Sequence, residues 1–159
     1  MERAITGFGQ DDVGDWFAHL ECFHRQHVRH NPPFFNRAWV VTEAGRASFL
    51  GKPLSCVRCD RLELPEGLTV YRKTPDFTEE TLPAGLQRDH SIKPGSWGQL
   101  LVFSGCLTLH IHEAVREVRG GDAAAIPPSA VHHVTITARP LSCRIDFLRP
   151  AVESGDALV

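Results

Sequence analysis

Two runs near the start of the chain alternate apolar with polar side chains, which is the pattern of a half-buried β-strand. They predict strands over Ala4–Gly9 and Asp15–Cys22. The intervening segment, Asp11–Gly14, is rich in residues that tolerate tight turns, so the two strands should form a hairpin. The short apolar run Ala38–Val41 predicts a third strand.

A short helix is expected next in the chain. Thr42 has the side chain of an N-cap, and Glu43–Leu50 follow it as the helix body. Gly51 and Pro53 then supply a C-terminal stop. This helix would lead the chain to a Cys-x-x-Cys motif.

From residue 68 onward the pattern changes to short strand-like runs between Gly and Pro turns. The spacing of these runs predicts a β-sandwich or a small barrel. The seven runs are Thr69–Lys73, Gln99–Phe103, Leu107–Ile111, Ala114–Arg119, Ala123–Ile126, Val131–Thr137 and Ser142–Leu148.

This change divides the chain into a small α+β domain and a larger β domain, so the fold class is mainly β. We place the first domain at residues 1–61 and the second at residues 68–150. The linker between them, residues 62–67, contains Pro65-Glu66-Gly67, and residues 151–159 form a tail.

Composition and charge narrow the range of partners. The chain has 159 residues, a net charge of −2 and 42% hydrophobic residues, which is ordinary for a soluble globular protein. Residues 1–61 carry eight Lys/Arg and seven Asp/Glu, or +1, and the remainder carries nine and twelve, or −3. Neither half has the positive charge of a nucleic-acid or membrane-surface binder, so we expect neither partner.

The chain also lacks the segments that would send it to a membrane. No apolar run approaches the ~20 residues of a membrane span, and the N-terminus lacks the basic and apolar regions of a signal peptide. We therefore expect a cytoplasmic protein whose five cysteines stay reduced. An odd number of cysteines with a Cys-x-x-Cys motif favours metal or redox use over disulfides.

Two short pairs of residues carry the clearest chemistry. Cys22 and His24 form the first pair, and Cys56 and Cys59 form the second. Zn²⁺ takes four N/S ligands in a tetrahedron, usually as two such pairs from separate turns. A domain of about sixty residues buries little core, so a metal would also supply stability. We predict a zinc site from these four residues; the alternatives for the imidazole ligand are His27 and His30.

Two other interpretations of these residues remain open. The cysteines can be buried side chains beside surface histidines, or Cys56 and Cys59 can form a redox-active pair. Against the redox pair, the motif does not follow the βαβ pattern of a thioredoxin-like site.

Residues 4–60 resemble a short bacterial family of unknown function, sometimes labelled pressure-regulated. The family usually has Gly between the first Cys and His, where this chain has Phe23. Because the family carries no established activity, the resemblance implies a fold more than a chemistry. The matching segments are Ile5-Thr6-Gly7-Phe8, Gln26 to Pro33, Arg37-Ala38-Trp39-Val40, Thr42-Glu43-x-Gly45-Arg46 and Cys56-x-x-Cys59.

The second domain carries most of the second cupin motif, a turn that presents one imidazole into a barrel. Gly121 is followed after five residues by Pro127-Pro128-Ser129 and then His132. Ser129 replaces the second Gly of the motif, and Ile136 replaces its Asn.

The first cupin motif is degraded. Its closing Gly is kept as Gly105. Where its His pair and Glu should lie, the chain offers His90, Lys93 and the segment Trp97-Gly98-Gln99.

Residues 75–150 resemble the small cupin-like family found in bacterial tellurite-resistance proteins and nitrate- or nitrite-responsive proteins. This resemblance implies a double-stranded β-helix barrel and a stress-linked, metal-binding role with no settled reaction. The matching residues are Pro75-x-Phe77, Thr81-Leu82-Pro83, Asp89-His90-Ser91-x-Lys93-x-Gly95-x-Trp97-Gly98, Gly105, Ile126-x-Pro128, His132-x-Val134 and Asp146-Phe147.

The barrel offers candidates for a second site. His90, His132 and Asp146 would suit Zn²⁺, Fe²⁺ or Mn²⁺ and leave open positions. The alternative is two hydrogen-bonded core histidines, with Asp146 paired to Lys93. Lys93 and Trp97 are the candidate ligand-binding residues.

Strand geometry predicts where the remaining histidines point. His110 and His112 should face outward if Leu107, Leu109 and Ile111 face the core, and His133 should point away from His132.

The favoured function is a two-module, metal-binding stress-response protein without enzymatic activity. Its zinc site would be structural or redox-sensing, and its barrel would bind a second divalent metal, a small anion or another small molecule. Cupin-like barrels often pair, so a homodimer is expected by analogy. One alternative is a cupin-type metal-dependent dioxygenase or isomerase. Another is a zinc-knuckle nucleic-acid binder, which needs a basic stripe with aromatics such as Arg25, Arg29, Phe34, Phe35 and Arg37.

Overall fold

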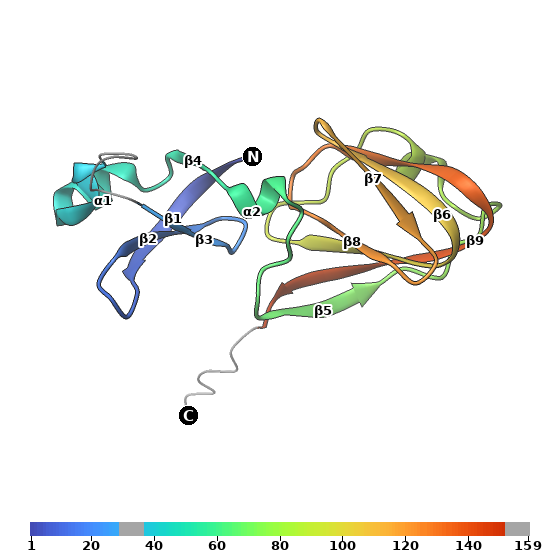
Figure 1. Ribbon diagram of the computed structural model, residues 1–159, viewed down its shortest axis with the longest axis horizontal. Coiled ribbons are helices and arrows are strands. Elements are labelled where there is room, and N and C mark those ends of the chain that lie inside the picture. Colours follow the sequence, from blue (N-terminus) through green and yellow to red (C-terminus); the bar gives the residue numbers. More distant parts are fainter. Residues whose placement is uncertain (29–36, 152–159) are drawn as a thin grey trace, which may run out of the picture. The chain divides into compact units, whose positions relative to one another are not determined.

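The computed structural model describes residues 1–28 and 37–151, and it divides into two compact units (Figure 1). Unit 1 comprises Met1–Pro65 and unit 2 comprises Glu66–Val159. The division falls within the segment that the sequence predicts as a linker. Mainly β structure is confirmed, and none of the helices in the described residues is long and apolar enough to cross a membrane.

Unit 1 is built on an antiparallel sheet of order β3-β2-β1-β4. The predicted hairpin is confirmed as its centre, with Gln10 opposite Trp16 at the closed end. The strands are β1 (Glu2–Gln10), β2 (Trp16–Leu20), β3 (Arg25–His27) and β4 (Pro53–Ser55).

The predicted helix is confirmed as α1 (Glu43–Phe49). The Thr42 hydroxyl oxygen accepts a hydrogen bond from the Gly45 backbone N–H at 3.1 Å, which is the expected N-cap. A Cβ at Gly45 would lie 2.0 Å from the backbone oxygen of Trp39, so only glycine fits this turn.

The prediction of a strand at Ala38–Val41 is wrong, because this run forms the 3₁₀ turn η1. Trp39 in this turn stacks on Phe49 of α1, with ring centroids 3.7 Å apart. A four-residue apolar run has too little periodicity to separate strand from helix, and here packing onto the neighbouring helix decides. A second short helix, α2 (Val57–Asp60), follows β4.

The described residues of unit 2 form five strands where the sequence predicts seven. The sheet order is β5-β9-β6-β7, and β8 pairs with β6. A 3₁₀ turn, η2 (Ala84–Gln87), lies between β5 and β6. The strands are β5 (Leu68–Lys73), β6 (Trp97–Ile111), β7 (Ala114–Arg119), β8 (Ala123–Ile126) and β9 (His132–Pro150).

The count differs because the two longest strands bend instead of ending. β6 and β9 pair from Trp97 opposite Leu148 to Ile111 opposite His132, with register shifts between Val102 and Leu107. Gly105 lies in this irregular stretch with φ +75°, and a Cβ there would approach a β9 carbonyl oxygen to 2.5 Å. Glycine and bulges let a strand curve while its pairing continues.

The core of unit 2 follows the predicted alternation along β6. Leu107, Leu109 and Ile111 are all fully buried, whereas His110 and His112 lie outside the core, as predicted. The His110 ring stacks on the ring of His133, with centroids 4.5 Å apart. His133 and His132 therefore lie on opposite faces of β9, as strand geometry requires.

Candidate metal centre and histidine cavity

The first half of the candidate metal centre is the tight turn that joins β2 to β3. The Phe23 N–H donates to the Leu20 carbonyl oxygen at 2.8 Å, and the Leu20 N–H donates to the His24 oxygen at 3.0 Å. Phe23 has φ +69°, in the left-handed region that favours glycine. This conformation explains why the resembling family usually has Gly here, and the turn forms with Phe as well. It brings Cys22 Sγ to 3.6 Å from His24 Nδ1.

The second half is the first turn of α2. Cys56 is the N-cap residue, and its N–H donates to the Met1 oxygen at 2.9 Å. The Cys56 carbonyl oxygen accepts from the Asp60 N–H at 3.2 Å, which starts the helix. Because residues three apart share one face of a helical turn, Cys59 projects beside Cys56.

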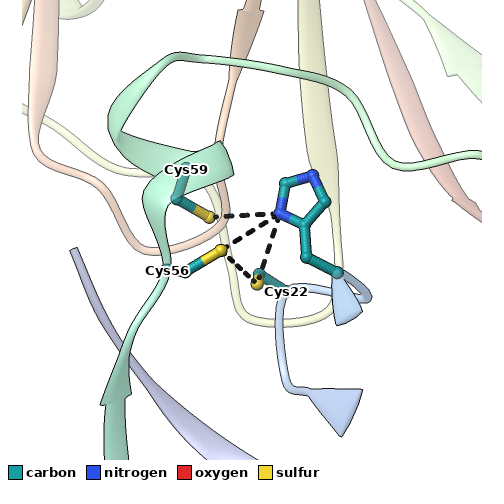
Figure 2. Close-up of side chains that lie close together, drawn as sticks. Cys22, Cys56 and Cys59 are labelled. Carbon is teal, nitrogen blue, oxygen red and sulfur yellow. Dashed lines mark hydrogen bonds between the residues drawn. The ribbon is translucent and has the colours of Figure 1, made fainter. Parts of the chain in front are cut away.

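The two turns bring together all four predicted ligands, which come from segments more than thirty residues apart in the chain (Figure 2). One ligand atom from each residue lies within 4.8 Å of all the others. His24 Nδ1 lies 3.6, 3.4 and 3.6 Å from the sulfurs of Cys22, Cys56 and Cys59. The Cys22 and Cys56 sulfurs are 3.8 Å apart. The three cysteines are fully buried, and His24 is 1% exposed.

These distances fit a tetrahedral zinc ion. Zn–S bonds of about 2.3 Å and Zn–N bonds of about 2.0–2.1 Å at tetrahedral angles place two sulfurs about 3.8 Å apart. The same geometry places sulfur and nitrogen about 3.6 Å apart. Cys22, His24, Cys56 and Cys59 therefore form a cluster that can hold a metal such as zinc.

The acidities of the thiols also favour a cation. Hydrogen bonds from the thiols of Cys22 and Cys59 hold the pKa of Cys56 well below its usual range. Hydrogen bonding to Cys56 raises the pKa of Cys22 to about 11. Hydrogen bonds with Cys22 and Cys56 raise the pKa of Cys59. The three thiols thus oppose one another's ionisation, and a divalent cation would be needed to keep all three cysteines ionised.

The alternative imidazoles are not part of the cluster. His27 lies on β3 with an exposed side chain, and its Nε2 is 3.0 Å from a carboxylate oxygen of Asp11. His30 lies outside the described residues. Among the described residues, the Cys/His cluster is the one group of three or more His, Cys, Asp and Glu side chains at metal-binding distances.

Unit 2 contains a cavity of about 270 Å³ that holds two of the predicted barrel residues, His90 and His132. Their rings are 4.1 Å apart, and their backbones exchange two hydrogen bonds of 3.0 and 2.9 Å. The turn before His132 contains Ser129 with φ +59°, so Ser129 occupies the left-handed position of the glycine that it replaces. The full lining is Tyr71, Arg72, Leu86, His90, Ser91, Ile92, Lys93, Ile126, His132, Ile145 and Phe147.

The hydrogen bonds of the two rings determine which nitrogens carry protons. His90 Nδ1 lies 2.8 Å from the Arg88 carbonyl oxygen, and His132 Nδ1 lies 2.8 Å from that of Ala130. Carbonyl oxygens only accept hydrogen bonds, so both Nδ1 atoms are donors and Nε2 is the unprotonated nitrogen of each neutral ring. Burial is the main cause of the lowered pKa of His132.

Charged neighbours modify this pKa in both directions. His90 and His133 disfavour the imidazolium form of His132, whereas Asp89 favours it, together with the Ala130 carbonyl. The lowered pKa keeps His132 neutral near pH 7.

Asp146 is not brought to the histidine pair. It alternates along β9 with Ile145 and Phe147, which line the cavity, so its own side chain points to the other face of the strand. Asp146 is buried, and its carboxylate accepts a hydrogen bond of 2.7 Å from Nε of Arg144 instead of pairing with Lys93. The cavity therefore offers two imidazoles without the predicted carboxylate.

The two predicted ligand-binding residues separate as well. Lys93 lines the cavity, whereas Trp97 is fully buried and does not. Tyr71 and Arg72 on β5 line it too, and sequence analysis missed them. No motif marks these two residues, because only the pairing of β5 with β9 brings them to the histidines.

Comparisons with known proteins divide the chain in the same way. Residues 6–63 match the model of a protein family of unknown function, DUF3565. Residues 72–145 match the model of the TehB-like domain. Each model covers less than half of the chain, and together they follow the predicted order of two modules.

Curated relatives match the second module. Two probable S-adenosyl-L-methionine-dependent methyltransferases named TehB, from two strains of Haemophilus influenzae, are 28% and 27% identical over 92 residues. Each match covers 50% of this chain and 30% of the relative. The chain thus spans less than a third of the length of these relatives.

Solved structures agree with this assignment. A crystal structure of a protein from E. coli K12 has 25% sequence identity and a TM-score of 0.54, and the match covers 57% of this chain and 99% of that one. The crystal structure of TehB from Haemophilus influenzae has 27% identity and a TM-score of 0.50, covering 54% of this chain and 32% of that one. Unit 2 is therefore similar to a TehB-like domain.

Proposed function

We propose that the protein is a two-module stress-response protein in which unit 1 carries a structural zinc ion and unit 2 binds a small oxyanion. The observation that carries the zinc assignment is the position of His24 Nδ1, 3.4–3.6 Å from three cysteine sulfurs. A structural role follows from the ligand set, because four protein ligands close a tetrahedral ion to substrate.

Burial supports the structural role over a sensing one. All three sulfurs lie in fully buried residues, so an oxidant has no direct path to a thiolate. A bound zinc would keep the thiolates ionised and would tie the β2–β3 turn to α2.

The cavity of unit 2 suits an anion. Arg72 and Lys93 supply two positive charges at its wall, and His90 and His132 can each donate from Nε2 once protonated. A volume of about 270 Å³ lies at the small end of ligand sites, which suits an oxyanion better than a nucleotide. The resemblance to a family found in tellurite-resistance and nitrate-responsive proteins agrees with this ligand class.

We further propose a cupin-like double-stranded β-helix for unit 2. The spacing from Gly121 to His132 supports it, as does the left-handed conformation of Ser129 at a glycine position of the motif. Two histidines without Asp146 favour an anion over a second metal. The methyltransferase activity in the names of the TehB relatives is not part of the proposal, because the match covers 30% of those proteins.

Elemental analysis of the purified protein tests the zinc site. We expect about one zinc per chain in the native protein and none in the Cys56→Ser/Cys59→Ser variant. A native protein that binds no zinc after reconstitution would refute the assignment.

Calorimetric titration with tellurite and with nitrate tests the cavity. Arg72→Gln should weaken binding at least tenfold, since it removes a charge from the wall. Lys73→Gln is the matched control, because Lys73 is the next residue of β5 and does not line the cavity. No heat with either anion, or equal loss in both variants, would reject the oxyanion.

A further inference from the structure

Unit 1 has a groove of about 890 Å³ beside the candidate metal centre, which we call the basic groove. It is formed by the β1–β2 turn, the strands β2 and β3, and the residues around Cys56 and Cys59. Its lining is Asp11, Phe17, Arg25, Gln26, His27, Arg37, Ser55, Val57, Arg58 and Arg61.

The basic groove collects positive charge that the overall composition hides. Among the described residues of positions 1–61, four arginines line it, and the carboxylate in its described lining, Asp11, is engaged by His27 at 3.0 Å. Outside the groove, Arg46 lies over the Trp16 ring at 3.9 Å and donates to a backbone carbonyl. Lys52 lies over the ring of Phe49.

Three arginines of the groove, Arg25, Arg58 and Arg61, are weakly neutralised in the contacts of the described residues. Arg58 and Arg61 share Glu63 at 3.6 and 3.9 Å, and all three side chains are about half exposed or more. Such surface pairs contribute ~1 kcal/mol at most, so an external anion can replace them. Arg25 lies over the Phe17 ring at 5.1 Å, which holds the side chain without neutralising its charge.

The proposed zinc ion would hold the walls of the groove together. Arg25 follows His24 directly, and Val57 and Arg58 lie between Cys56 and Cys59. An ion bound by these ligands fixes the spacing between the β3 wall and the α2 wall. This step rests on the proposed zinc site, whereas the charge of the groove does not.

We propose that the basic groove binds the phosphodiester backbone of single-stranded nucleic acid. The planar guanidinium fork of arginine matches a phosphate in two hydrogen bonds. A concave, open groove follows one flexible strand, whereas a duplex needs a protruding helix or ribbon to enter its own grooves. Phe17 is 8% exposed and is covered by Arg25, so contact is made to phosphates and is not expected to depend on base sequence.

The salt dependence of binding measures the number of phosphate contacts. For single strands, log K falls with log salt concentration by about 0.7 per phosphate neutralised, so four arginines predict a slope of about −2.8. We would measure fluorescence anisotropy of a labelled oligothymidylate of about twelve nucleotides, between 50 and 200 mM salt. The Arg25→Gln/Arg61→Gln variant should halve the slope. It should also lose on the order of 50-fold in affinity at 50 mM salt.

Lys52→Gln is the matched control, because it removes one charge from unit 1 outside the groove. A native slope near −2.8 that is halved only in the arginine variant supports the proposal. Absence of binding at 50 mM salt, or equal weakening in Lys52→Gln, overturns it. Displacement of the strand by an equal concentration of duplex or mononucleotide also overturns it.

Zinc content, measured on the same samples, separates the two proposals. Protein that holds zinc and binds no strand refutes the groove and leaves the zinc site intact. Protein without zinc that binds with the predicted slope refutes the zinc site and supports the groove. Variants that keep native zinc content and native circular dichroism confirm that lost binding does not come from unfolding.

Discussion

Removal of the metal should unfold unit 1 and leave unit 2 folded. A structural zinc site contributes roughly 10–16 kcal/mol of apparent binding free energy. An unsupported domain of this size has a stability of about 3–5 kcal/mol at most. The described part of unit 1 buries seven large apolar side chains, a small core beside such a loss; they are Ile5, Phe17, Leu20, Val28, Val40, Leu54 and Leu62.

Hydrogen exchange read by mass spectrometry resolves the two units. In the Cys56→Ser/Cys59→Ser variant, amides across the described part of unit 1 should lose protection, including the Leu20 N–H bound to the His24 oxygen and the Cys56 N–H bound to the Met1 oxygen. Amides of β6 and β9 should keep theirs. The match covers 99% of the similar E. coli chain, so that chain folds without a counterpart of unit 1. Unit 2 is therefore expected to fold independently.

The matched control is Cys106→Ser, which changes a buried cysteine of unit 2 outside the cluster. It should leave the protection of unit 1 unchanged. Zinc-free protein in which unit 1 keeps native protection would refute the reasoning, because the metal would then contribute nothing to the fold.

Three further predictions concern unit 2. Oxyanion affinity should rise as pH falls through the pKa of His132, which lies below 6.5, because protonation creates an Nε2–H donor. Binding titrations from pH 7.5 to 5 test this rise. A His132→Gln protein whose affinity still rises would contradict the prediction. Ser129→Gly should stabilise unit 2 by up to ~1 kcal/mol, since an exposed residue at φ +59° is strained; a lower urea midpoint would count against this. Gly105→Ala should destabilise unit 2 by about 2 kcal/mol or more in urea unfolding, because its Cβ would meet a carbonyl oxygen at 2.5 Å. Gly85→Ala has open space around its Cβ, so it should leave the stability of unit 2 nearly unchanged. Equal effects of the two alanine substitutions would contradict the clash.

Much of unit 1 follows from short-range sequence signals. Each pair of candidate metal ligands lies within one turn, so the Cys-x-His and Cys-x-x-Cys spacings predict the cluster without knowledge of the fold. The hairpin and α1 are also local, because turn residues and the Thr42 cap act within a few positions. The φ value of Phe23 shows that such a turn forms even when its usual glycine is absent.

The strand count of unit 2 depends on long-range pairing. In the sequence, Gly105 predicts a turn, because it separates the apolar runs Gln99–Phe103 and Leu107–Ile111. Pairing of β6 with β9 on both sides of the bend keeps each strand continuous. Local patterns contain no information about a partner that lies about forty residues away.

The direction of side chains at the unit 2 cavity and the basic groove was likewise decided by tertiary structure. Asp146 has the right chemistry for the histidine pair, but the period of two along β9 turns it to the other face. The net charge of residues 1–61 is +1, which argues against an anionic partner, yet folding gathers four arginines in one groove. Net charge is a sum over the chain, whereas an anion responds to the charges within a Debye length of about 8–10 Å, and only the fold sets which charges those are.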